Sequence, residues 1–417
     1  MKASQWTALG LTGALAVTLA ACAPNGEGNG GDGGTGGNGA SGGDSLSILI
    51  ASSGPAEAGY YQEAAARFTE QTGTEVEIVV ANDLIQQLGQ GFAGNNPPDL
   101  FYLPWDQFET YASQGFLEPY AGELANAGDF LPALVEQFSY QDEFYCAPKD
   151  FSTLGLQINT EAWEAAGLTD ADVPTTWDDL ATVAASLTDG DQVGLSMGRE
   201  YARVGVFMNQ AGGQLVDGDT VTADTADNAA GLEYLQGLIA DGSLVFPPDL
   251  EAGWGGEAFG LGRAAMVVEG PWINGAMAND FPDREFISVE LPAGPGGPST
   301  YSFATCWGMP IDSDTRDSAM EFVEFVTTPE EQLLAAEAFG VIPSTSAGAD
   351  SYASQFPENA AFVAGVDYAV SPVAFAGAAA AVSEFNTELE NIANASPSAL
   401  LASLQTNLQS ALDSARG

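Results

Sequence analysis

The sequence predicts an α/β fold. Its 417 residues exceed the usual size of one domain, which favours two domains or one elaborate domain. Hydrophobic residues make up 45% and aromatic residues 10% of the chain, so a mostly disordered protein is excluded. Short apolar runs alternate with helical runs beyond residue 45, and this alternation is typical of a parallel sheet covered by helices.

The first six expected elements show the alternation directly. The run from Glu75 to Val80 places Val76, Ile78 and Val80 on one face, as a half-buried strand does. Gly73 ends the helix before it, because glycine readily adopts the left-handed conformation found after helices. In chain order the expected elements are 46–51 (strand), 57–72 (helix), 75–80 (strand), 83–92 (helix), 100–103 (strand) and 106–113 (helix).

The loops that follow these three strands form a candidate ligand site. In parallel α/β sheets, ligands bind beyond the carboxyl ends of the strands. Three loops leave those ends, namely Ser52-Ser53-Gly54, Ala81-Asn82 and Pro104-Trp105-Asp106.

The later elements follow from caps and periodicity. Thr175 and Thr176 are suitable helix caps, and Asp178 and Asp179 fall in the first turn of that helix, so these acids have a structural role first. A strand over 265–269 leads through Gly270 to Pro271, which suits the first position of a helix. Helices are also expected over 317–328 and, as a long tail with one polar side, over 383–415.

The charge balance excludes whole classes of function. There are 9 Lys and Arg residues against 57 Asp and Glu, a formal net charge of −48, and phosphate binding needs basic patches, so a nucleic-acid partner is excluded. Because there is no histidine, no His-based triad, general base or metal ligand exists, and no metal or cofactor is expected. The surplus acid favours a solvated, self-repelling surface over an acidic binding face.

The N-terminus is a processing signal. An apolar run over 8–21 is too short to span a membrane comfortably and ends in small residues before Cys22, as in the lipobox of bacterial lipoproteins. We therefore expect a signal peptide over 1–21, lipid on Cys22 and a glycine-rich tether over 22–45. The folded body would hang outside the cytoplasmic membrane, anchored only by lipid. An ordinary export signal with a chance cysteine is the alternative.

Once Cys22 is lipidated, two cysteines remain. Cys146 and Cys306 form an even pair in an oxidising compartment, where disulfides persist. Two unrelated buried thiols are the alternative.

Four tryptophans stand beside glycine or proline in expected loops. Indole faces suit the C–H faces of sugar rings, and nearby acids such as Glu257 can accept hydrogen bonds from sugar hydroxyls. Packing in a core is the alternative for each ring, but is less favoured for all four together. The four are Trp105, Trp254, Trp272 and Trp307, with Asp106 and Glu269 among the neighbouring acids.

In this order, the motifs of residues 46–417 resemble the extracellular solute-binding proteins of ABC importers, of the maltose-binding type. The most specific segment is 259–272, which reads Phe-x-x-Gly-x-Ala-Ala-Met-x-x-Glu-Gly-Pro-Trp. The other matching segments are Pro98-Asp99-Leu100-Phe101, Trp105-Asp106, Gly115-Phe116-Leu117, Ala147-Pro148-Lys149-Asp150-Phe151-Ser152, Ile158-Asn159, Pro174-Thr175-Thr176-Trp177, 321–325, Glu330-x-Gln332 and 340–344.

This resemblance implies a two-lobed periplasmic-binding-protein fold. Two α/β lobes would be joined by a hinge of crossing segments and would close on ligand in the cleft between them. Lobe 1 would comprise 46–150 and 307–343, and lobe 2 would comprise 152–305 and 345–417.

The resemblance also implies roles for individual residues. Asp106 would bind sugar hydroxyls and Trp272 would stack on a sugar ring, while Trp105 and Trp307 would line the cleft by location. The segment Lys149-Asp150-Phe151-Ser152 would lie at the hinge near the ligand, with a salt bridge as the alternative role of Lys149. Ser53, Gly54, Asn82, Trp254 and Glu269 complete the candidate ligand residues. A charged pair of the maltose-binding members is replaced by Ser52-Ser53-Gly54, which argues against maltose.

The hinge of this family implies a disulfide as well. Its two crossing segments run side by side, and Cys146 and Cys306 lie at the implied crossings. Their Cα atoms would then come within the roughly 4.4–6.8 Å that a disulfide needs.

The function that follows is binding without turnover. A monomeric lipoprotein would capture a carbohydrate, most simply an oligosaccharide, and deliver it to an ABC transporter permease. One competing class is a secreted glycosidase, since two carboxylates suffice for that chemistry and need no histidine. Another is a binding protein for a non-sugar solute such as a polyamine.

Overall fold

The structure is a computed structural model that describes residues 45–52, 55–218 and 220–416. The expected signal peptide over 1–21, Cys22 and nearly all of the tether lie outside these residues, as do Ser53 and Gly54. Each strand and helix expected over 46–113 is present, with boundaries within two residues of the prediction. The α/β fold class is confirmed.

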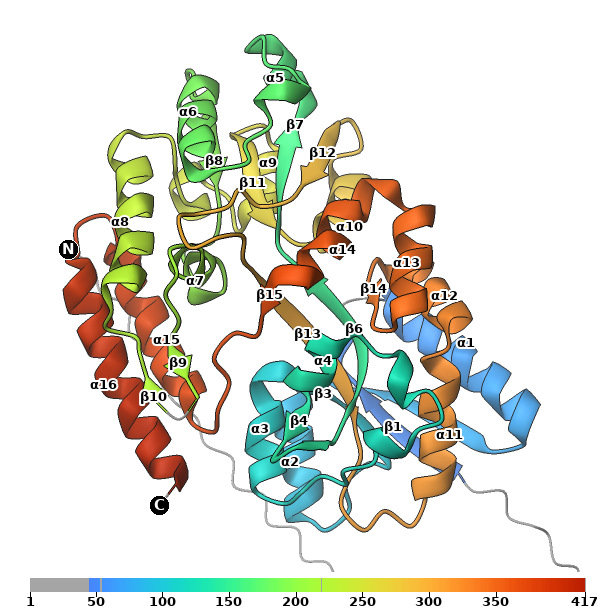
Figure 1. The fold of residues 1–417 in the computed structure, drawn as a ribbon. Coiled ribbons are helices and arrows are strands. Elements are labelled where there is room, and N and C mark those ends of the chain that lie inside the picture. The colour runs from blue at the N-terminus through green and yellow to red at the C-terminus, as the bar shows by residue number, and fades with distance from the viewer. Residues whose placement is uncertain (1–44, 53–54, 219, 417) are drawn as a thin grey trace, which may run out of the picture. The chain divides into compact units, whose positions relative to one another are not determined.

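The larger sheet has seven strands (Figure 1). Its strands β1, β2 and β3 are parallel, as expected. However, β13 runs antiparallel to β3 and to β6, so the sheet is mixed rather than purely parallel. The strand order is β14 (Ile342–Pro343), β6 (Ala147–Thr153), β13 (Thr300–Gly308), β3 (Leu100–Pro104), β1 (Ser45–Ile50) and β2 (Glu75–Val80), with β15 (Ala369–Val370) beside β13.

The smaller sheet has four strands and its own core. Its order is β12 (Phe286–Val289), β7 (Gly155–Asn159), β11 (Ala264–Glu269) and β8 (Val193–Ser196). Only β8 and β11 are parallel. Two short hairpins pair β4 (Ser139–Tyr140) with β5 (Glu143–Phe144) and β9 (Val216–Asp217) with β10 (Thr220–Val221).

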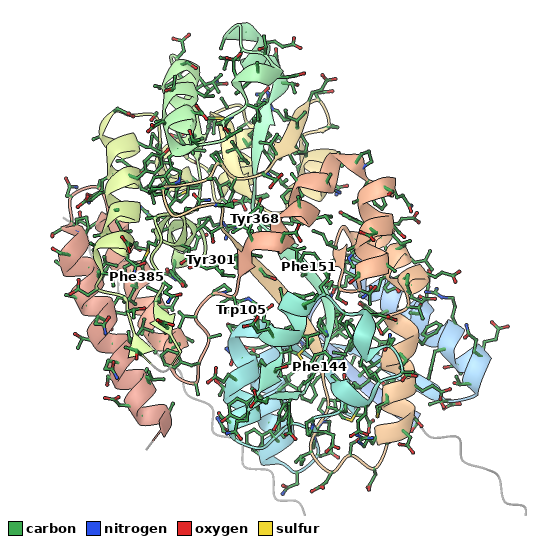
Figure 2. All side chains as sticks on the ribbon, viewed as in Figure 1. Trp105, Phe144, Phe151, Tyr301, Tyr368 and Phe385 are labelled. Carbon is green, nitrogen blue, oxygen red and sulfur yellow. A yellow bond between two sulfur atoms is a disulfide. The ribbon has the colours of Figure 1, made fainter. Side chains whose placement is uncertain are left out.

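Apolar residues gather in two large cores, one on each main sheet. The first core includes Phe151, and the second includes Tyr301 and Phe385 (Figure 2). Helices of the first core are α1 (Pro55–Thr72), α2 (Leu84–Ala93), α3 (Trp105–Ser113), α4 (Pro132–Gln137), α11 (Arg316–Val326), α12 (Pro329–Phe339), α13 (Ser346–Gln355) and α14 (Ala360–Ala364). Helices of the second core are α5 (Thr160–Ala165), α6 (Trp177–Leu187), α7 (Tyr201–Gln210), α8 (Ala226–Ala240), α15 (Ala378–Glu388) and α16 (Pro397–Arg416).

A smaller core lies beside the four-stranded sheet. It contains Phe259 of α9 (Gly255–Gly260), Val267 of β11, and Ile273 and Met277 of α10 (Trp272–Asp280). Together the three cores bury most of the large apolar side chains of the described residues.

Part of the segment expected in the second lobe packs on the first core instead. Tyr352 of α13 and Phe362 of α14 are buried in the first core, although 345–417 was assigned to the second lobe. The helical tail is also interrupted, because α15 ends at Glu388 and a new helix, α16, starts at Pro397, a residue that suits the first turn of a helix. The tail therefore forms the two helices α15 and α16, which pack on each other.

Local caps explain where helices begin. The expected cap at Thr176 is present, since its hydroxyl accepts a hydrogen bond from the backbone N–H of Asp179. The Asp179 carboxylate in turn accepts hydrogen bonds from the hydroxyl and the backbone N–H of Thr176 at 2.8 and 3.0 Å. Those bonds lower the pKa of Asp179 and give this acid the structural role expected of it.

Two strands connect the sheets. β6 ends at Thr153, and β7 of the smaller sheet begins two residues later. β13 begins with Tyr301 in the second core and ends with Trp307 in the first, pairing with β6 over most of its length (Figure 1). Both strands thus cross between the two cores side by side.

A disulfide joins Cys146 to Cys306, as predicted. The two Cα atoms are 5.5 Å apart, Cys146 immediately precedes β6, and Cys306 lies on β13. Both cysteines are fully buried. The bridge therefore links the two crossing strands at their first-core end.

Replacing both cysteines by alanine should lower the free energy of unfolding by about 2–5 kcal/mol. The physical reason is that the bridge closes a loop of 160 residues and restricts the unfolded chain. Urea unfolding of wild type and of Cys146→Ala/Cys306→Ala measures the difference. Equal stability of the two proteins, or alkylation of both cysteines in the unreduced wild-type protein, would contradict the prediction.

Candidate functional site

Three aromatic rings connect elements of the two sheets. Trp105 begins α3 directly after β3, and Trp272 begins α10 three residues after β11. Both rings approach Phe303 on β13, with centroid distances of 6.2 Å for Trp105 and 6.4 Å for Trp272. Trp272 is 39% exposed, and the other two rings are partly exposed. These three residues, called here the aromatic bridge, offer ring faces beside the crossing strands.

Phe303 was missed by sequence reasoning. Within β13 only Phe303 and Thr305 are partly exposed, and every other residue is buried. Nothing in the neighbouring sequence distinguishes an exposed phenylalanine from a buried one. The only sequence feature that could have indicated Phe303 was its position three residues before Cys306, near the implied crossing segment.

Asp106 lies next to the aromatic bridge. It is in the first turn of α3, beside Trp105, and is partly exposed. Its carboxylate accepts a hydrogen bond from Gln107 Nε2 at 3.3 Å, which leaves further acceptor positions for ligand hydroxyls. Asn82 is exposed in the loop between β2 and α2, where the sequence suggested a ligand loop.

Ser152 lies beside Phe303 on the neighbouring strand. These residues are register partners, and the Ser152 hydroxyl is 3.5 Å from the Phe303 carbonyl oxygen. Ser152 is partly exposed, whereas its neighbour Phe151 is 1% exposed and packs in the first core. Phe151 therefore presents no surface to a ligand, contrary to the prediction, because its side chain points to the opposite face of the strand.

Trp307 is also a core residue rather than a cleft residue. Its ring is fully buried and makes edge contacts with Tyr61 at 5.4 Å, Tyr102 at 5.1 Å and Phe322 at 5.9 Å. Because Phe303 and Trp307 are four residues apart on β13, they share a face of the strand. Helices α1 and α11 cover only the Trp307 end of that face.

Trp254 packs away from the aromatic bridge. Its ring packs on the small core that contains Phe259 and lies over Gly256, where a Cβ atom would come within 2.1 Å of it. Trp254 is partly exposed at its outer edge. No ring contact joins it to Trp105, Phe303 or Trp272.

Lys149 forms a buried ion-pair cluster, which supports the salt-bridge alternative. Its side chain is 5% exposed, and Nζ pairs with Glu57 at 3.1 Å and with Asp150. The strand register skips Lys149, since Thr305 pairs with Asp150 and Cys306 with Pro148. This bulge in β6 turns the ammonium group into the first core, where it lies 4.6 Å from the Tyr102 ring centroid.

The cluster shifts the pKa of both charged partners. Burial raises the pKa of Asp150 to about 6, although Lys149 opposes that rise. Burial alone would lower the pKa of Lys149, but the carboxylates of Asp150 and Glu57 outweigh it and raise the pKa overall. Lys149 therefore remains charged at neutral pH.

Glu269 is buried as well, contrary to the prediction that it meets ligand hydroxyls. It is 2% exposed at the end of β11. Its carboxylate accepts hydrogen bonds from Arg203 at 2.6 Å and from Trp272 Nε1 at 3.0 Å. Burial raises the pKa of Glu269, with Arg203 opposing the rise.

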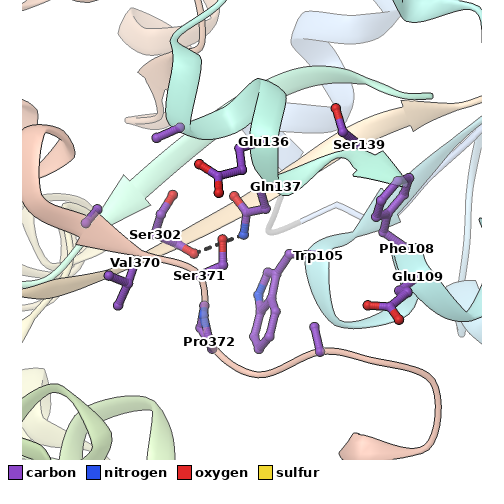
Figure 3. A pocket seen from close by; sticks show the side chains of 13 residues that line it. Trp105, Phe108, Glu109, Glu136, Gln137, Ser139, Ser302, Val370, Ser371 and Pro372 are labelled. Atoms are coloured by element: carbon purple, nitrogen blue, oxygen red, sulfur yellow. Dashed lines mark hydrogen bonds between the residues drawn. The ribbon is translucent and has the colours of Figure 1, made fainter. Parts of the chain in front are cut away.

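A cavity of about 400 Å³ lies against the Trp105 side of the bridge (Figure 3). Glu109 and Glu136 contribute carboxylates, and no lysine or arginine lines it. Gln137 donates a hydrogen bond to the Ser302 carbonyl oxygen at 3.3 Å, which ties α4 to β13. The segment 369–374 forms another wall. Sequence reasoning missed this cavity, because its walls come from segments more than 200 residues apart.

Two features are absent from the described residues, namely a membrane-spanning helix and a metal-ligand cluster. No helix within 45–52, 55–218 and 220–416 is both long and apolar enough to span a membrane. Those same ranges contain no group of three Cys, Asp or Glu side chains placed to hold a metal ion.

Comparisons with known proteins agree on one family. A family model described as bacterial extracellular solute-binding protein matches residues 63–364. The diacetylchitobiose binding protein DasA of Streptomyces coelicolor is 25% identical over 362 residues, covering 83% of each chain.

Solved structures show the same fold. The substrate-binding protein Lmo0181 of Listeria monocytogenes, in complex with cycloalternan, has a TM-score of 0.76 and 21% identity, covering 88% of this chain and 98% of that one. The cyclic alpha-maltosyl-1,6-maltose binding protein of Arthrobacter globiformis has a TM-score of 0.79 and 20% identity, covering 89% and 100%. These likenesses show the two-lobed fold.

Replacing Lys149 by methionine should lower the free energy of unfolding by about 3–5 kcal/mol at pH 7, because two buried carboxylates lose their counter-charge. Removing the cation raises the folded-state pKa of Asp150 further above its unfolded value. Stability lost at pH 7 should therefore return as the pH falls through that raised pKa towards 4. Urea unfolding at pH 7 and 4.5 measures the loss.

The matched control is Glu251→Gln, which removes the charge of an exposed carboxylate 3.6 Å from Arg263 and should cost less than about 1 kcal/mol. A Lys149→Met deficit that does not shrink at pH 4.5 would refute the buried-charge explanation.

Replacing Trp307 by alanine should lower the free energy of unfolding by about 3–5 kcal/mol without any ligand, because a fully enclosed ring leaves a cavity. Replacing Trp272 by alanine should cost much less, because that ring is 39% exposed. Thermal or urea unfolding of the two variants compares them directly. Equal losses would show that Trp272 is a core residue too.

Proposed function

Because the chain belongs to the bacterial extracellular solute-binding protein family, we propose that it binds an oligosaccharide and passes it to an ABC transporter permease. The observation that carries this proposal is the aromatic bridge. Trp105, Phe303 and Trp272 lie on three segments from both sheets and meet beside the crossing strands.

The chemistry around the bridge suits sugars. Partly exposed indole rings can stack on the apolar faces of sugar rings, while the carboxylate of Asp106 and the hydroxyl of Ser152 can take part in hydrogen bonds with sugar hydroxyls. No lysine or arginine is among the residues that line the adjoining cavity, and its acceptor groups suit a ligand rich in hydrogen-bond donors. Of the similar proteins, one is named for binding diacetylchitobiose and another for binding cyclic alpha-maltosyl-1,6-maltose, and a third is in complex with cycloalternan.

The crossing strands supply the proposed hinge. In this proposal lobe 1 comprises 46–150 and 307–343, and lobe 2 comprises 152–305 and 345–417, with 345–364 packing on the first core. β6 and β13 would serve as the crossing segments, held together by the disulfide. Lobe rotation about them would bring Trp105 and Trp272 onto opposite sides of a bound sugar.

The ionisation of the buried acids favours binding over hydrolysis. A glycosidase needs a proton-donating carboxyl with a raised pKa that faces the substrate. Asp150 has its pKa raised to about 6, but it is 8% exposed and bonded to Lys149. Glu269 is bonded to Arg203 and Trp272. Neither carboxyl is placed to protonate a glycosidic oxygen.

We also propose the cellular setting. Removal of residues 1–21 and lipidation of Cys22 would anchor a monomer to the outer side of the cytoplasmic membrane. The tether over 22–45 would let the folded part reach the permease. No other membrane contact, cofactor or nucleic acid has a role in this proposal.

Titration calorimetry of the folded part should detect binding within a panel of malto-, cello-, xylo-, galacto- and acetylated chito-oligosaccharides. Trp272→Ala and Trp105→Ala should each weaken that binding by about ten- to hundredfold, since stacking on an aromatic ring is worth roughly 1–3 kcal/mol. Trp163→Phe, which changes a buried ring in α5, is the matched control and should bind as wild type.

Two outcomes would overturn the proposal. Shortened products after long incubation would favour the glycosidase. If the protein bound polyamines and none of the sugars, the family assignment would stand, but the proposal of a sugar ligand would be wrong.

A further inference from the structure

We propose that Arg203 and Glu269 form a positioning pair, which fixes the indole of Trp272 before any ligand arrives. Glu269 would then influence the ligand only through Trp272. This inference rests on the proposed function, because it concerns the stacking ring of the same site. The proposal assigns a role to the Arg203–Glu269 pair, whose carboxylate is too enclosed to contact a ligand directly.

The backbone of Glu269 is fixed first. Gln157 on the neighbouring strand β7 is fully buried, and both ends of its amide bond Glu269. The Glu269 N–H donates to Gln157 Oε1 at 3.0 Å, and Gln157 Nε2 donates to the Glu269 carbonyl at 3.3 Å. The carboxylate therefore projects from a rigid strand end rather than from a loop.

The carboxylate itself is enclosed. One oxygen, Oε2, accepts from both Arg203 Nη2 at 2.6 Å and Trp272 Nε1 at 3.0 Å. The other oxygen, Oε1, lies against Gly255, where an added Cβ atom would be 2.6 Å away. With 2% of its surface exposed, Glu269 has no room for a sugar hydroxyl.

Arg203 neutralises the negative charge of the buried Glu269 carboxylate. Its guanidinium bonds Glu269 with one nitrogen and Glu200 with another, the latter at 2.8 Å. Its central carbon lies 5.5 Å from the centroid of the Trp272 ring, within the range of a cation–π contact. The planar guanidinium can make all three contacts at once, which a lysine ammonium cannot.

The ring of Trp272 is restrained from a further side. It lies over Gly270, where a Cβ atom would come within 2.3 Å of Cζ3. The indole is therefore fixed by its N–H bond, by the guanidinium and by the glycine backbone, yet it remains 39% exposed. Fixing a side chain in its bound orientation removes an ordering cost of about 0.5–1.5 kcal/mol on binding, which corresponds to roughly two- to twelvefold in affinity.

The test uses Glu269→Gln, which keeps the shape and an acceptor oxygen but removes the charge, together with Arg203→Lys. In ligand-free, ¹⁵N-labelled protein, both variants should shift the Trp272 indole N–H resonance and speed its exchange with water. Glu331→Gln is the matched control, because Glu331 is a buried partner of Arg67 at 2.6 Å in the first core. That variant should leave the Trp272 resonance unchanged.

The second readout is affinity for two probes, diacetylchitobiose and maltotetraose. For a probe that binds, Glu269→Gln should raise Kd by about three- to tenfold in the wild-type background. In a Trp272→Ala background the same substitution should leave Kd unchanged, since the positioned ring is gone. An equal rise in both backgrounds would show that Glu269 touches the ligand and would overturn the proposal.

The ligand-free readout separates this proposal from the proposed function. An unchanged indole resonance in Glu269→Gln and Arg203→Lys overturns the positioning pair, whatever binds. If neither these probes nor any other sugar binds, the proposed function fails, while the resonance still decides whether the pair fixes Trp272.

Discussion

The antiparallel pairing of β6 with β13 is the contact on which the rest of the structure depends. These two strands carry the chain between the cores, and the buried disulfide holds them at one end. The bulge at Lys149 aims a cation into the first core, while Ser152 and Phe303 remain at the surface in register with each other. One pairing thus determines both the buried charge of the first core and the partly exposed face that carries Phe303.

Because the chain has only 9 basic residues, their positions show which buried carboxylates need a counter-charge. Burying a carboxylate without a partner is very costly, and each buried acid of the described residues has a basic partner. Lys149 partners Glu57 and Asp150, Arg203 partners Glu269, and Arg67 partners Glu331. Most of the other acids are at the surface, where solvent screens their repulsion. The ion pairs of Lys149 lie at the crossing strand β6, and that of Arg203 lies beside the ring of Trp272.

The tryptophans show that burial by neighbouring helices changes the role of a residue. Trp272 and Trp307 both stand beside glycine or proline in the sequence. In the fold, α1 and α11 enclose Trp307, whereas Trp272 lies at the start of α10 with one part of its ring exposed. Sequence context identified tryptophans beside turns but could not separate a buried ring from an exposed one. Burial depends on what packs above the ring.

The sequence by itself determined the α/β class, the elements over 46–113, the two cysteines of the bridge and the family. These features depend on periodicity, caps and ordered motifs, all of which are local or nearly local. Only the tertiary structure decided that β13 is antiparallel, that Phe151, Trp307 and Glu269 are buried, that Lys149 forms an ion pair, and that Phe303 joins two tryptophans. Each of these depends on contacts between segments far apart in the chain, and one sequence carries no direct record of such contacts.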